Sequence, residues 1–381
     1  METIAQQIAE LARSADDVSR HAIITALRDI SYGIETPEDT MERIWSSGLT
    51  FAIVRVATNL KLFDHLAMSG KSLDVENLAR LTKADPVLLS RLLRYLAAFG
   101  MLKESGKGEF EGTPITTTLM QKGSKAAILH NFDTCNPAIQ ALPEFLERSG
   151  YRNPTDSNNT AWQVGWNTTE NCFEWMSSHP HAVEALNTHL ATRRQNQPSW
   201  VQSYPVRERV DAKNFSSDRT LFVDIGGNIG HKAIEFRNAY PELPGRVIVQ
   251  DLPFAVNNAI KAPGVEAMVH DFNHAQPIKG AKFYYLRYVL HDWPDEKCRI
   301  ILKNVIDAMA DDTIILVDEM VLPDWGVKWQ VAHVDLLMLV SNAAMERTES
   351  QWGDLYESVG LGIEDRYVYG PSMYESITAL V

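Results

Sequence analysis

The stretch LFVDIGGNIG, residues 221–230, decides the fold of the C-terminal part of the chain. An apolar strand that runs into glycines and then into a helix brings backbone N–H groups close to a bound ligand. A carboxylate about 20 residues farther on suits the hydroxyl pair of a ribose, and Asp251 ends the next apolar run. The pattern predicts a nucleotide-type cofactor site, and the simpler alternative is an ordinary strand-to-helix turn. The GGNIG run departs from the dinucleotide fingerprint, which disfavours NAD.

From residue 220 onward, predicted strands alternate with predicted helices. The strands cover residues 221–224, 246–250, 265–270, 283–290 and 313–318, and the helices cover 232–239, 254–260 and 295–309. This alternation indicates an α/β fold with a Rossmann-like parallel sheet. Ligands bind such sheets at the carboxyl ends of the strands. We therefore expect one crevice to collect the residues at those ends: Asp224, Gly226, Asp251, Asp271, His291 and Glu319.

The N-terminal part is predicted to be mostly helical. Apolar residues recur at three- and four-residue steps over residues 3–31 and 37–66. Residues 73–118 follow the order helix, helix and hairpin, which is the layout of a winged helix. The second of these helices is rich in leucine, and Arg91 and Arg94 are its only cations, so we expect it to contact protein rather than DNA.

The composition excludes several kinds of partner. The net charge of −13 disfavours nucleic acid and anionic membranes. The three cysteines are isolated, without the spacing of a metal site or a disulfide framework, and the histidines form no familiar ligand spacing with carboxylates. The start METIA lacks the features of a signal peptide, and no apolar run approaches the length of about 20 residues that spans a membrane. We expect a cytoplasmic protein without a metal or a membrane span.

Taken together, the motifs resemble class I S-adenosylmethionine-dependent methyltransferases. More narrowly, the chain is similar to the small-molecule O-methyltransferase family of plants and fungi in DIGGNIGH (224–231), QDLP (250–253), HDF (270–272), LRYVLHDW (286–293) and ERT (346–348). The HDW signature is far more specific than the glycines. This family pairs an N-terminal winged-helix dimerisation region with a Rossmann-like cofactor domain.

The resemblance implies a homodimer with S-adenosylmethionine as its cofactor. It divides the chain into a dimerisation region (1–125), a helical connecting and substrate-lining region (126–204) and a catalytic domain (205–381). The implied cofactor-binding residues are Asp224, Gly226, Gly227, Asp251, Leu252, Asp271, Phe272 and Arg287.

The same resemblance implies that His291 is a general base oriented by two acids, Glu319 and Glu346. A phenol loses its proton near pH 10 unless a base helps, and a histidine with an ordinary pKa of about 6.5 is mostly neutral at pH 7. A carboxylate on the other ring nitrogen would select the tautomer and stabilise the imidazolium. The simpler alternatives are a satisfied buried histidine, Asp292 as a helix N-cap, and Glu346 in a surface ion pair with Arg347.

Residues 129–200 are rich in aromatic side chains. Core packing is the simpler interpretation, and an apolar pocket for an aromatic or polyketide-like small molecule is the more specific one. The residues expected to contact that substrate are His130, Asp133, Trp175, Met338 and Asn342, of which Asn342 lies in the variable segment 340–345.

We therefore expect an S-adenosylmethionine-dependent O-methyltransferase that acts on a phenolic or enolic secondary metabolite. The first alternative is a pericyclase or dehydratase of the same fold, which catalyses a cyclisation such as a Diels–Alder or Alder-ene reaction in fungal natural-product biosynthesis. In such relatives the base position tends to carry a different cation, so His291 with both acids favours methyl transfer. A winged-helix regulatory protein with a ligand-sensing domain is the second alternative.

Overall fold

The computed structural model describes residues 2–193, 199–371 and 373–381. The chain forms two compact units that interleave along the sequence. Unit 1 contains Met1–Pro137 and Trp175–Asn196, and unit 2 contains Ala138–Glu174 and Gln197–Val381. The three-part division predicted from the sequence stays a prediction.

Unit 1 begins with three helices, α1 (Glu2–Ser14), α2 (Asp17–Ile34) and α3 (Pro37–Asn59). The side chain of Asp16 accepts a hydrogen bond from the N–H of Ser19, and Thr36 forms a capping box with Asp39, so both α2 and α3 begin at strong N-caps. No residue of α2 is buried, and none of residues 3–14 is either. The apolar side chains of α1 and α2 therefore lie largely on the surface of unit 1.

A small module with its own core follows in unit 1. Its elements are α4 (Leu62–Ser69), β1 (Leu73–Asp74), α5 (Val75–Thr82), α6 (Pro86–Ala98), β2 (Leu102–Gly106) and β3 (Glu109–Gly112). The strands form an antiparallel sheet in the order β1-β3-β2. Gly108 takes a φ of +71° in the hairpin turn, a conformation that favours glycine. The predicted order of helix, helix and hairpin is confirmed.

A run of helices follows this module along the chain and is divided between the two units. They are α7 (Pro114–Leu119), α8 (Lys122–Leu129), the π-helix η1 (His130–Cys135), α9 (Asn136–Arg148), α10 (Ala161–Trp166), α11 (Cys172–Ser177) and α12 (Pro180–Arg193). Within unit 1, α12 lies along α8.

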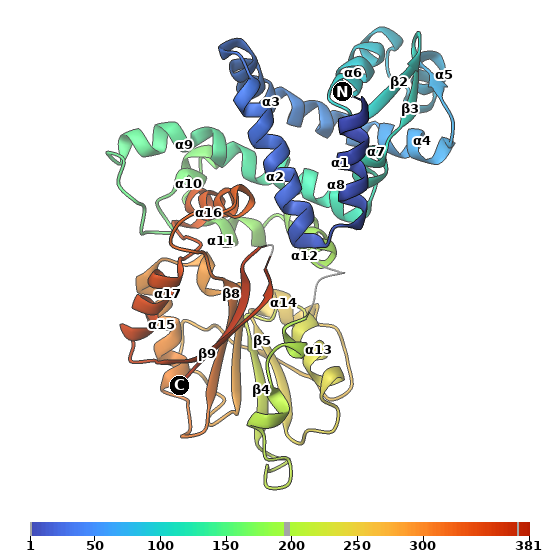
Figure 1. Cartoon of the computed structure of the whole chain (residues 1–381). Coiled ribbons are helices and arrows are strands. Elements are labelled where there is room, and N and C mark those ends of the chain that lie inside the picture. Colours follow the sequence, from blue (N-terminus) through green and yellow to red (C-terminus); the bar gives the residue numbers. More distant parts are fainter. Residues whose placement is uncertain (1, 194–198, 372) are drawn as a thin grey trace. The chain divides into compact units, whose positions relative to one another are not determined.

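Unit 2 is built on a seven-stranded sheet (Figure 1). The order across it is β6 (Glu266–Val269), β5 (Arg246–Asp251), β4 (Thr220–Ile225), β7 (Phe283–Arg287), β8 (Ile314–Met320), β10 (Glu375–Leu380) and β9 (Ile363–Gly370). The five strands from β6 to β8 are parallel, and β10 is antiparallel to both β8 and β9. The predicted α/β fold is confirmed, whereas the two antiparallel strands were not expected.

Each face of the sheet is covered by its own apolar core. On one face, α13 (His231–Ala239) and the short helices η2 (Trp200–Gln202) and η3 (Val206–Arg209) bury aromatic residues of the strands. On the other, α15 (Asp295–Ile306) and α17 (Glu349–Glu357) do the same. Unit 2 also contains α14 (Pro253–Asn257), η4 (Leu290–Asp292) and α16 (Trp329–Asn342). Buried on both sides, the sheet holds the ends of its strands in fixed positions.

Within the described parts of the chain, no helix combines the length and the apolar character needed to cross a bilayer.

Candidate active site

The turn after β4 is packed too closely to hold a side chain at two of its positions. Gly226 takes a φ of +70°, and a Cβ atom there would lie 2.9 Å from Cγ2 of Val289. A Cβ atom on Gly227 would lie 2.5 Å from Oδ2 of Asp224. The N–H groups of both glycines donate to the carbonyl of Gln250, at 2.8 and 3.1 Å, and tie this turn to the end of β5. Glycine is therefore required at both positions.

Two carboxylates flank this turn. Asp224 is 1% exposed and accepts a hydrogen bond from the N–H of Ala233 at 3.1 Å, and burial raises its pKa to about 7. Asp251 accepts from the N–H of Asn228 at 2.8 Å and from that of Leu252 at 2.7 Å, while burial raises its pKa. Asn228 adopts a φ of +53°, which asparagine tolerates better than most residues. Asp251 thus joins the turn to the end of β5, and its contact with a ribose stays a prediction.

Other predicted cofactor residues lie around the same strand ends. Phe272 lies close to Gly226, because a Cβ atom built there would be 3.8 Å from its ring. The same ring makes an edge contact with Trp293 at 6.0 Å between centroids. Leu252 is 51% exposed, and Asp271 accepts a hydrogen bond from the N–H of Asn273 at 2.9 Å. Phe272 therefore connects the glycine turn with the HDW segment.

Arg287, the last residue of β7, is held inside the protein. Its guanidinium donates to Asp318 and contacts the hydroxyl of Tyr369, and Nη2 lies 3.5 Å from Oε1 of Glu375. Tyr369 in turn donates to Oδ1 of Asp318 at 2.6 Å. Acidic and phenolic groups of β8, β9 and β10 therefore surround this charge, and its contact with a cofactor stays a prediction.

His291 lies in η4, directly after the end of β7, with its ring paired to a buried acid. Nδ1 is 2.7 Å from Oε1 of Glu346, whose side chain is 0% exposed. Since Nδ1 faces a carboxylate, it carries the ring proton, and Nε2 is left as the site that exchanges protons. Nε2 lies 3.5 Å from Oδ1 of Asp292.

The electrostatic surroundings of His291 differ from the sequence-based expectation of an ordinary pKa. Burial acts to lower the pKa of His291, but Glu346, with smaller contributions from Asp292 and Glu319, raises it to about 10. The surrounding acids therefore favour the protonated form of His291.

The two predicted orienting acids have different partners. Oε1 of Glu319 accepts hydrogen bonds from three consecutive N–H groups, at 3.0 Å from Val289, 3.0 Å from Leu290 and 3.3 Å from His291. Burial raises the pKa of Glu319 to about 8. Glu346 contacts the imidazole, whereas Glu319 holds the backbone that carries it.

Arg347 is a residue of the site that the sequence analysis missed. It is 1% exposed, donates to Oδ1 of Asp295 at 2.7 Å, and donates to the carbonyls of Leu290 at 3.0 Å and Trp293 at 2.9 Å. The neighbouring residues Glu346 and Arg347 therefore hold the ring and the loop of the HDW segment, respectively. The adjacent charges in the ERT motif were the available signal for this role.

Two of the simpler alternatives are wrong. Glu346 is 3% exposed and precedes α17, so it does not form a surface ion pair on a helix. The helix after the HDW segment begins at Asp295 with Pro294 at its N-cap, so Asp292 is not the cap. The carboxylate of Asp292 instead faces His291.

Two predicted substrate residues belong to α16. Asn342 is 5% exposed, and its Nδ2 lies 3.4 Å from Oδ1 of Asp292, which brings it into the surroundings of His291. Met338, one turn earlier in the helix, is half-buried. Aromatic rings also gather on this side of the HDW segment, where Phe173 stacks on Trp293 at 5.5 Å. The surroundings of His291 thus combine apolar rings with a few polar groups.

The remaining predicted substrate residues lie in unit 1. Asp133 pairs with Arg55 at 2.7 Å, and Nε2 of His130 lies 3.5 Å from Sγ of Cys135. Burial lowers the pKa of His130 to about 4. Trp175 stacks on His179 at 3.7 Å between ring centroids. The part of His130, Asp133 and Trp175 in substrate binding stays a prediction.

Among the described residues, no group of three or more His, Cys, Asp or Glu side chains has the arrangement of a metal site.

Known proteins resemble this chain over its whole length. Residues 185–362 match the O-methyltransferase domain, and residues 46–122 match the O-methyltransferase dimerisation domain. The demethylsterigmatocystin 6-O-methyltransferase of Aspergillus parasiticus is 40% identical over 369 residues, which cover 97% of this chain and 95% of that protein. The chain belongs to the O-methyltransferase family. The family predicted from the sequence motifs is confirmed.

Two solved structures resemble this O-methyltransferase-family chain over its whole length. One is described as a pericyclic reaction enzyme, with 34% identity, a TM-score of 0.92 and coverage of 100% of this chain and 98% of that one. The other, LepI in complex with S-adenosylmethionine, has the same identity, TM-score and coverage. The predicted cofactor class agrees with the family and with this second structure.

Proposed function

We propose that this protein transfers a methyl group from S-adenosylmethionine to a phenolic or enolic hydroxyl of a secondary metabolite, with His291 as the general base. The observation that carries the proposal is the buried pair of His291 and Glu346, 2.7 Å apart, next to a glycine turn at the carboxyl end of the sheet. A histidine whose Nδ1 donates to a carboxylate is oriented to exchange a proton at Nε2.

The residues around the glycine turn fit the cofactor. S-adenosylmethionine supplies an electrophilic methyl group on a positively charged sulfur. Gly226 and Gly227 allow a tight turn that a Cβ atom would block, and Asp251 lies at the end of β5, where a ribose hydroxyl pair binds in such sheets. Phe272 adds an aromatic face beside the same turn.

Because the pKa of His291 is raised by nearby acids, a charge bound close to the ring changes how much of the base is neutral. A positive charge bound nearby lowers the pKa of an imidazole, because like charges disfavour the protonated form. His291 then accepts the proton of the acceptor hydroxyl at Nε2, and Glu346 stabilises the imidazolium that forms. Asp292 and Asn342, on the Nε2 side, supply polar groups that orient the acceptor.

Replacement of the base tests this function. General acid–base catalysis contributes about 10²–10⁴-fold, so His291→Gln should lower methyl transfer by at least about 10²-fold. The assay uses [methyl-14C]S-adenosylmethionine with a panel of fused-ring phenols. Calorimetry with S-adenosylhomocysteine provides the control, because binding should stay within about twofold of the unmodified protein. Undiminished turnover by H291Q would refute the assignment of the base.

A pericyclase is the second candidate, and a specific observation favours it. An imidazolium with a pKa of about 10 is a cation that can polarise a substrate carbonyl, and a pericyclic reaction enzyme is 34% identical to this chain. Mass spectrometry separates the two functions. A product that gains a methyl group supports methyl transfer, and a product with the substrate's mass, or with one water fewer, supports the alternative.

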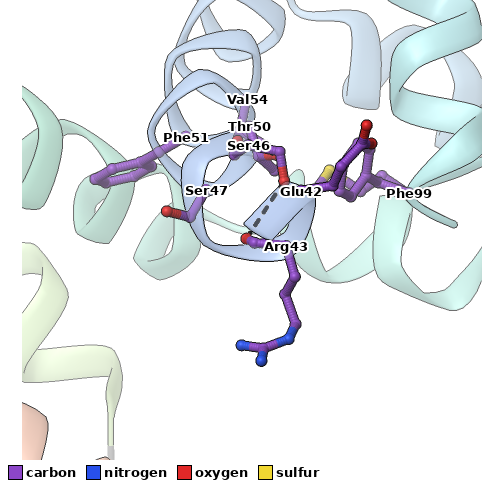
Figure 2. Close-up of a pocket in the computed structure, with 9 residues that line it drawn as sticks. Glu42, Arg43, Ser46, Ser47, Thr50, Phe51, Val54 and Phe99 are labelled. Carbon is purple, nitrogen blue, oxygen red and sulfur yellow. Dashed lines mark hydrogen bonds between the residues drawn. The ribbon is translucent and has the colours of Figure 1, made fainter. Parts of the chain in front are cut away.

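We also propose a homodimer formed through unit 1. Its support is the match to the dimerisation domain and the exposure of apolar side chains on α3, where Trp45 is 64% exposed and Leu49 is 54% exposed. An open groove of about 610 Å³ adjoins them, and its lining includes Phe51, Val54 and Phe99 (Figure 2). Light scattering should give twice the chain mass, and W45E/L49E should give the monomer mass; a monomeric unmodified protein would contradict the proposal.

A further inference from the structure

Tyr288, which directly follows β7, holds an unusual backbone conformation close to the base. Its φ of +49° lies in the left-handed region, which a bulky residue rarely adopts. Such strain persists only where surrounding contacts maintain it, and it concentrates at functional sites.

Contacts from two strands hold Tyr288 in place. Its N–H donates to the carbonyl of Asp318 on β8 at 3.2 Å, and its hydroxyl donates to Oε1 of the buried Glu375 on β10 at 2.9 Å. The guanidinium carbon of Arg287 lies 4.7 Å from the centre of the Tyr288 ring. The side chain also packs against the apolar cluster of Met320, Leu322 and Val331. The ring is thus fixed at its backbone and at its hydroxyl.

The fixed ring lies against the imidazole. The centroids of Tyr288 and His291 are 5.1 Å apart, and their planes meet at 50°. The hydrogen bond from Nδ1 to Glu346 fixes one atom of the imidazole but leaves rotation about that bond, whereas a neighbouring ring restricts the plane. We propose that Tyr288 is a positioning residue, which fixes the plane of the His291 ring and stabilises its protonated form. This inference rests on the proposed role of His291 as the base.

The direction of the effect follows from the charges around both rings. Glu346, Asp292 and Glu319 face His291. The charged groups around Tyr288 are Arg287, Glu375 and Asp318. The guanidinium of Arg287 lies next to both of these carboxylates. A cation over the face of an aromatic ring, within about 6 Å of its centre, is stabilised by it, and the two rings here are 5.1 Å apart and tilted by 50°. Loss of the Tyr288 ring should therefore lower the pKa of His291, while the three acids around the imidazole remain.

Two substitutions separate the ring from its hydroxyl. Tyr288→Asn removes the ring and keeps a residue that tolerates positive φ. Tyr288→Phe keeps the ring and removes the bond to Glu375. Tyr374→Asn is the matched control, because Tyr374 has a φ of +59° and packs against the same apolar cluster. The probe is the full-length protein with S-adenosylhomocysteine, and the pKa of His291 is read from the 13Cε1 resonance of labelled histidine, assigned with H291Q.

We expect Y288N to lower the pKa of His291 by about half a unit or more, since cation–π contacts contribute about 0.5–2 kcal/mol and one pKa unit corresponds to about 1.4 kcal/mol. On the plateau of the pH profile, where His291 is neutral in both proteins, its kcat for methyl transfer should fall about tenfold with unchanged cofactor affinity, as expected of a misoriented base. Y288F and Y374N should keep the pKa within about 0.2 units of the unmodified value.

An unchanged pKa and kcat in Y288N would overturn the inference. If Y288N does not fold, Tyr288→Leu, which keeps the apolar packing without an aromatic face, carries the same expectations. The resonance measurement needs no acceptor, so its outcome is independent of turnover. Full activity in H291Q would refute the proposed function, whereas an inactive H291Q with a normal Y288N would refute only the role of Tyr288.

Discussion

The charge of individual acidic residues in the interior depends strongly on pH. Burial raises the pKa of Asp292 to about 6 and that of Glu319 to about 8, and Asp224, beneath the glycine turn, has a pKa of about 7. These pKa values lie within the pH range in which enzymes work. Small changes in pH or in bound charge therefore change the ionisation of the site.

The rate of methyl transfer should rise with pH. A base acts in its neutral form, and below its pKa the neutral fraction of His291 increases about tenfold for each pH unit. We expect log kcat to increase from pH 6 with a slope approaching one and to level off at or below pH 10, because the surrounding acids raise the pKa of His291 to about 10. A pH profile of kcat checks this, with buffers matched in ionic strength. A rate that falls between pH 6 and 9 would contradict it.

Asp224 should make the folded protein less stable as pH rises. In the folded protein its pKa of about 7 exceeds the ordinary value of 3.8, so between these pH values the folded state binds more protons than the unfolded state. The stabilisation is full below about pH 4 and is lost as pH rises through 7. Asp224→Asn, whose Oδ1 can still accept from Ala233, should raise Tm at pH 8 by at least about 2 °C. The exposed Asp218→Asn is the control, and equal Tm curves for D224N and D218N would contradict this.

Among the elements, the short segment after β7 depends on groups outside it. Glu319 of β8 accepts three of its backbone N–H groups, and Arg347, just before α17, donates to two of its carbonyls. A segment without regular secondary structure needs such partners, because its backbone groups are buried. The position of His291 is therefore set by β8 and by the start of α17 as well as by β7.

Two variants of Glu319 distinguish its charge from its hydrogen bonds. Glu319→Gln keeps an oxygen that accepts from the N–H groups, so it should preserve most of the stability. Glu319→Ala leaves the buried N–H groups of Val289 and Leu290 without that acceptor, which costs about 1–3 kcal/mol for each unsatisfied group. Denaturant unfolding measures the difference, and amide exchange at residues 289–291 localises it. Equal stability of E319A and E319Q would contradict this role.

The sequence predicted the strand ends of the site because parallel strands with apolar runs are easy to recognise. It did not predict β9 and β10. In β10, Glu375, Ser376 and Thr378 are buried, so polarity there does not report exposure. The distinct partners of Glu319 and Glu346, and the loop contacts of Arg347, depend on side-chain directions that no spacing of residues conveys. The raised pKa of His291 has the same origin, since it requires acids from three separate segments.

At the scale of the whole molecule, the first two helices, α1 and α2, contribute almost nothing to a buried core. Residues 3–14 and all of α2 lack buried side chains, although Ile4, Leu11 and Ile30 are apolar and at least 60% exposed. Isolated helices of this length are marginal in water, so packing against another surface must stabilise them. The proposed dimer supplies such a surface.

Removal of residues 1–35 should weaken the dimer. If the exposed faces of α1 and α2 are covered by a second chain, their loss reduces the buried apolar area and makes Tm depend more steeply on protein concentration. Sedimentation equilibrium should show the dimer dissociation constant of the truncated protein rise at least about tenfold. The substitution L11A/I30A on the full chain tests the same faces without truncation. Unchanged association in both variants would contradict this.

The interleaving of the two units constrains how this chain can be divided or recombined. Unit 1 requires the stretch from Trp175 to Asn196, and unit 2 requires the stretch from Ala138 to Glu174 that precedes it. A single cut or crossover after Pro137 would leave the N-terminal fragment without α12, the helix that lies along α8. Chimaeras that exchange unit 2 between relatives therefore need a junction at every point where the chain passes from one unit to the other. A fusion with a single junction should be insoluble.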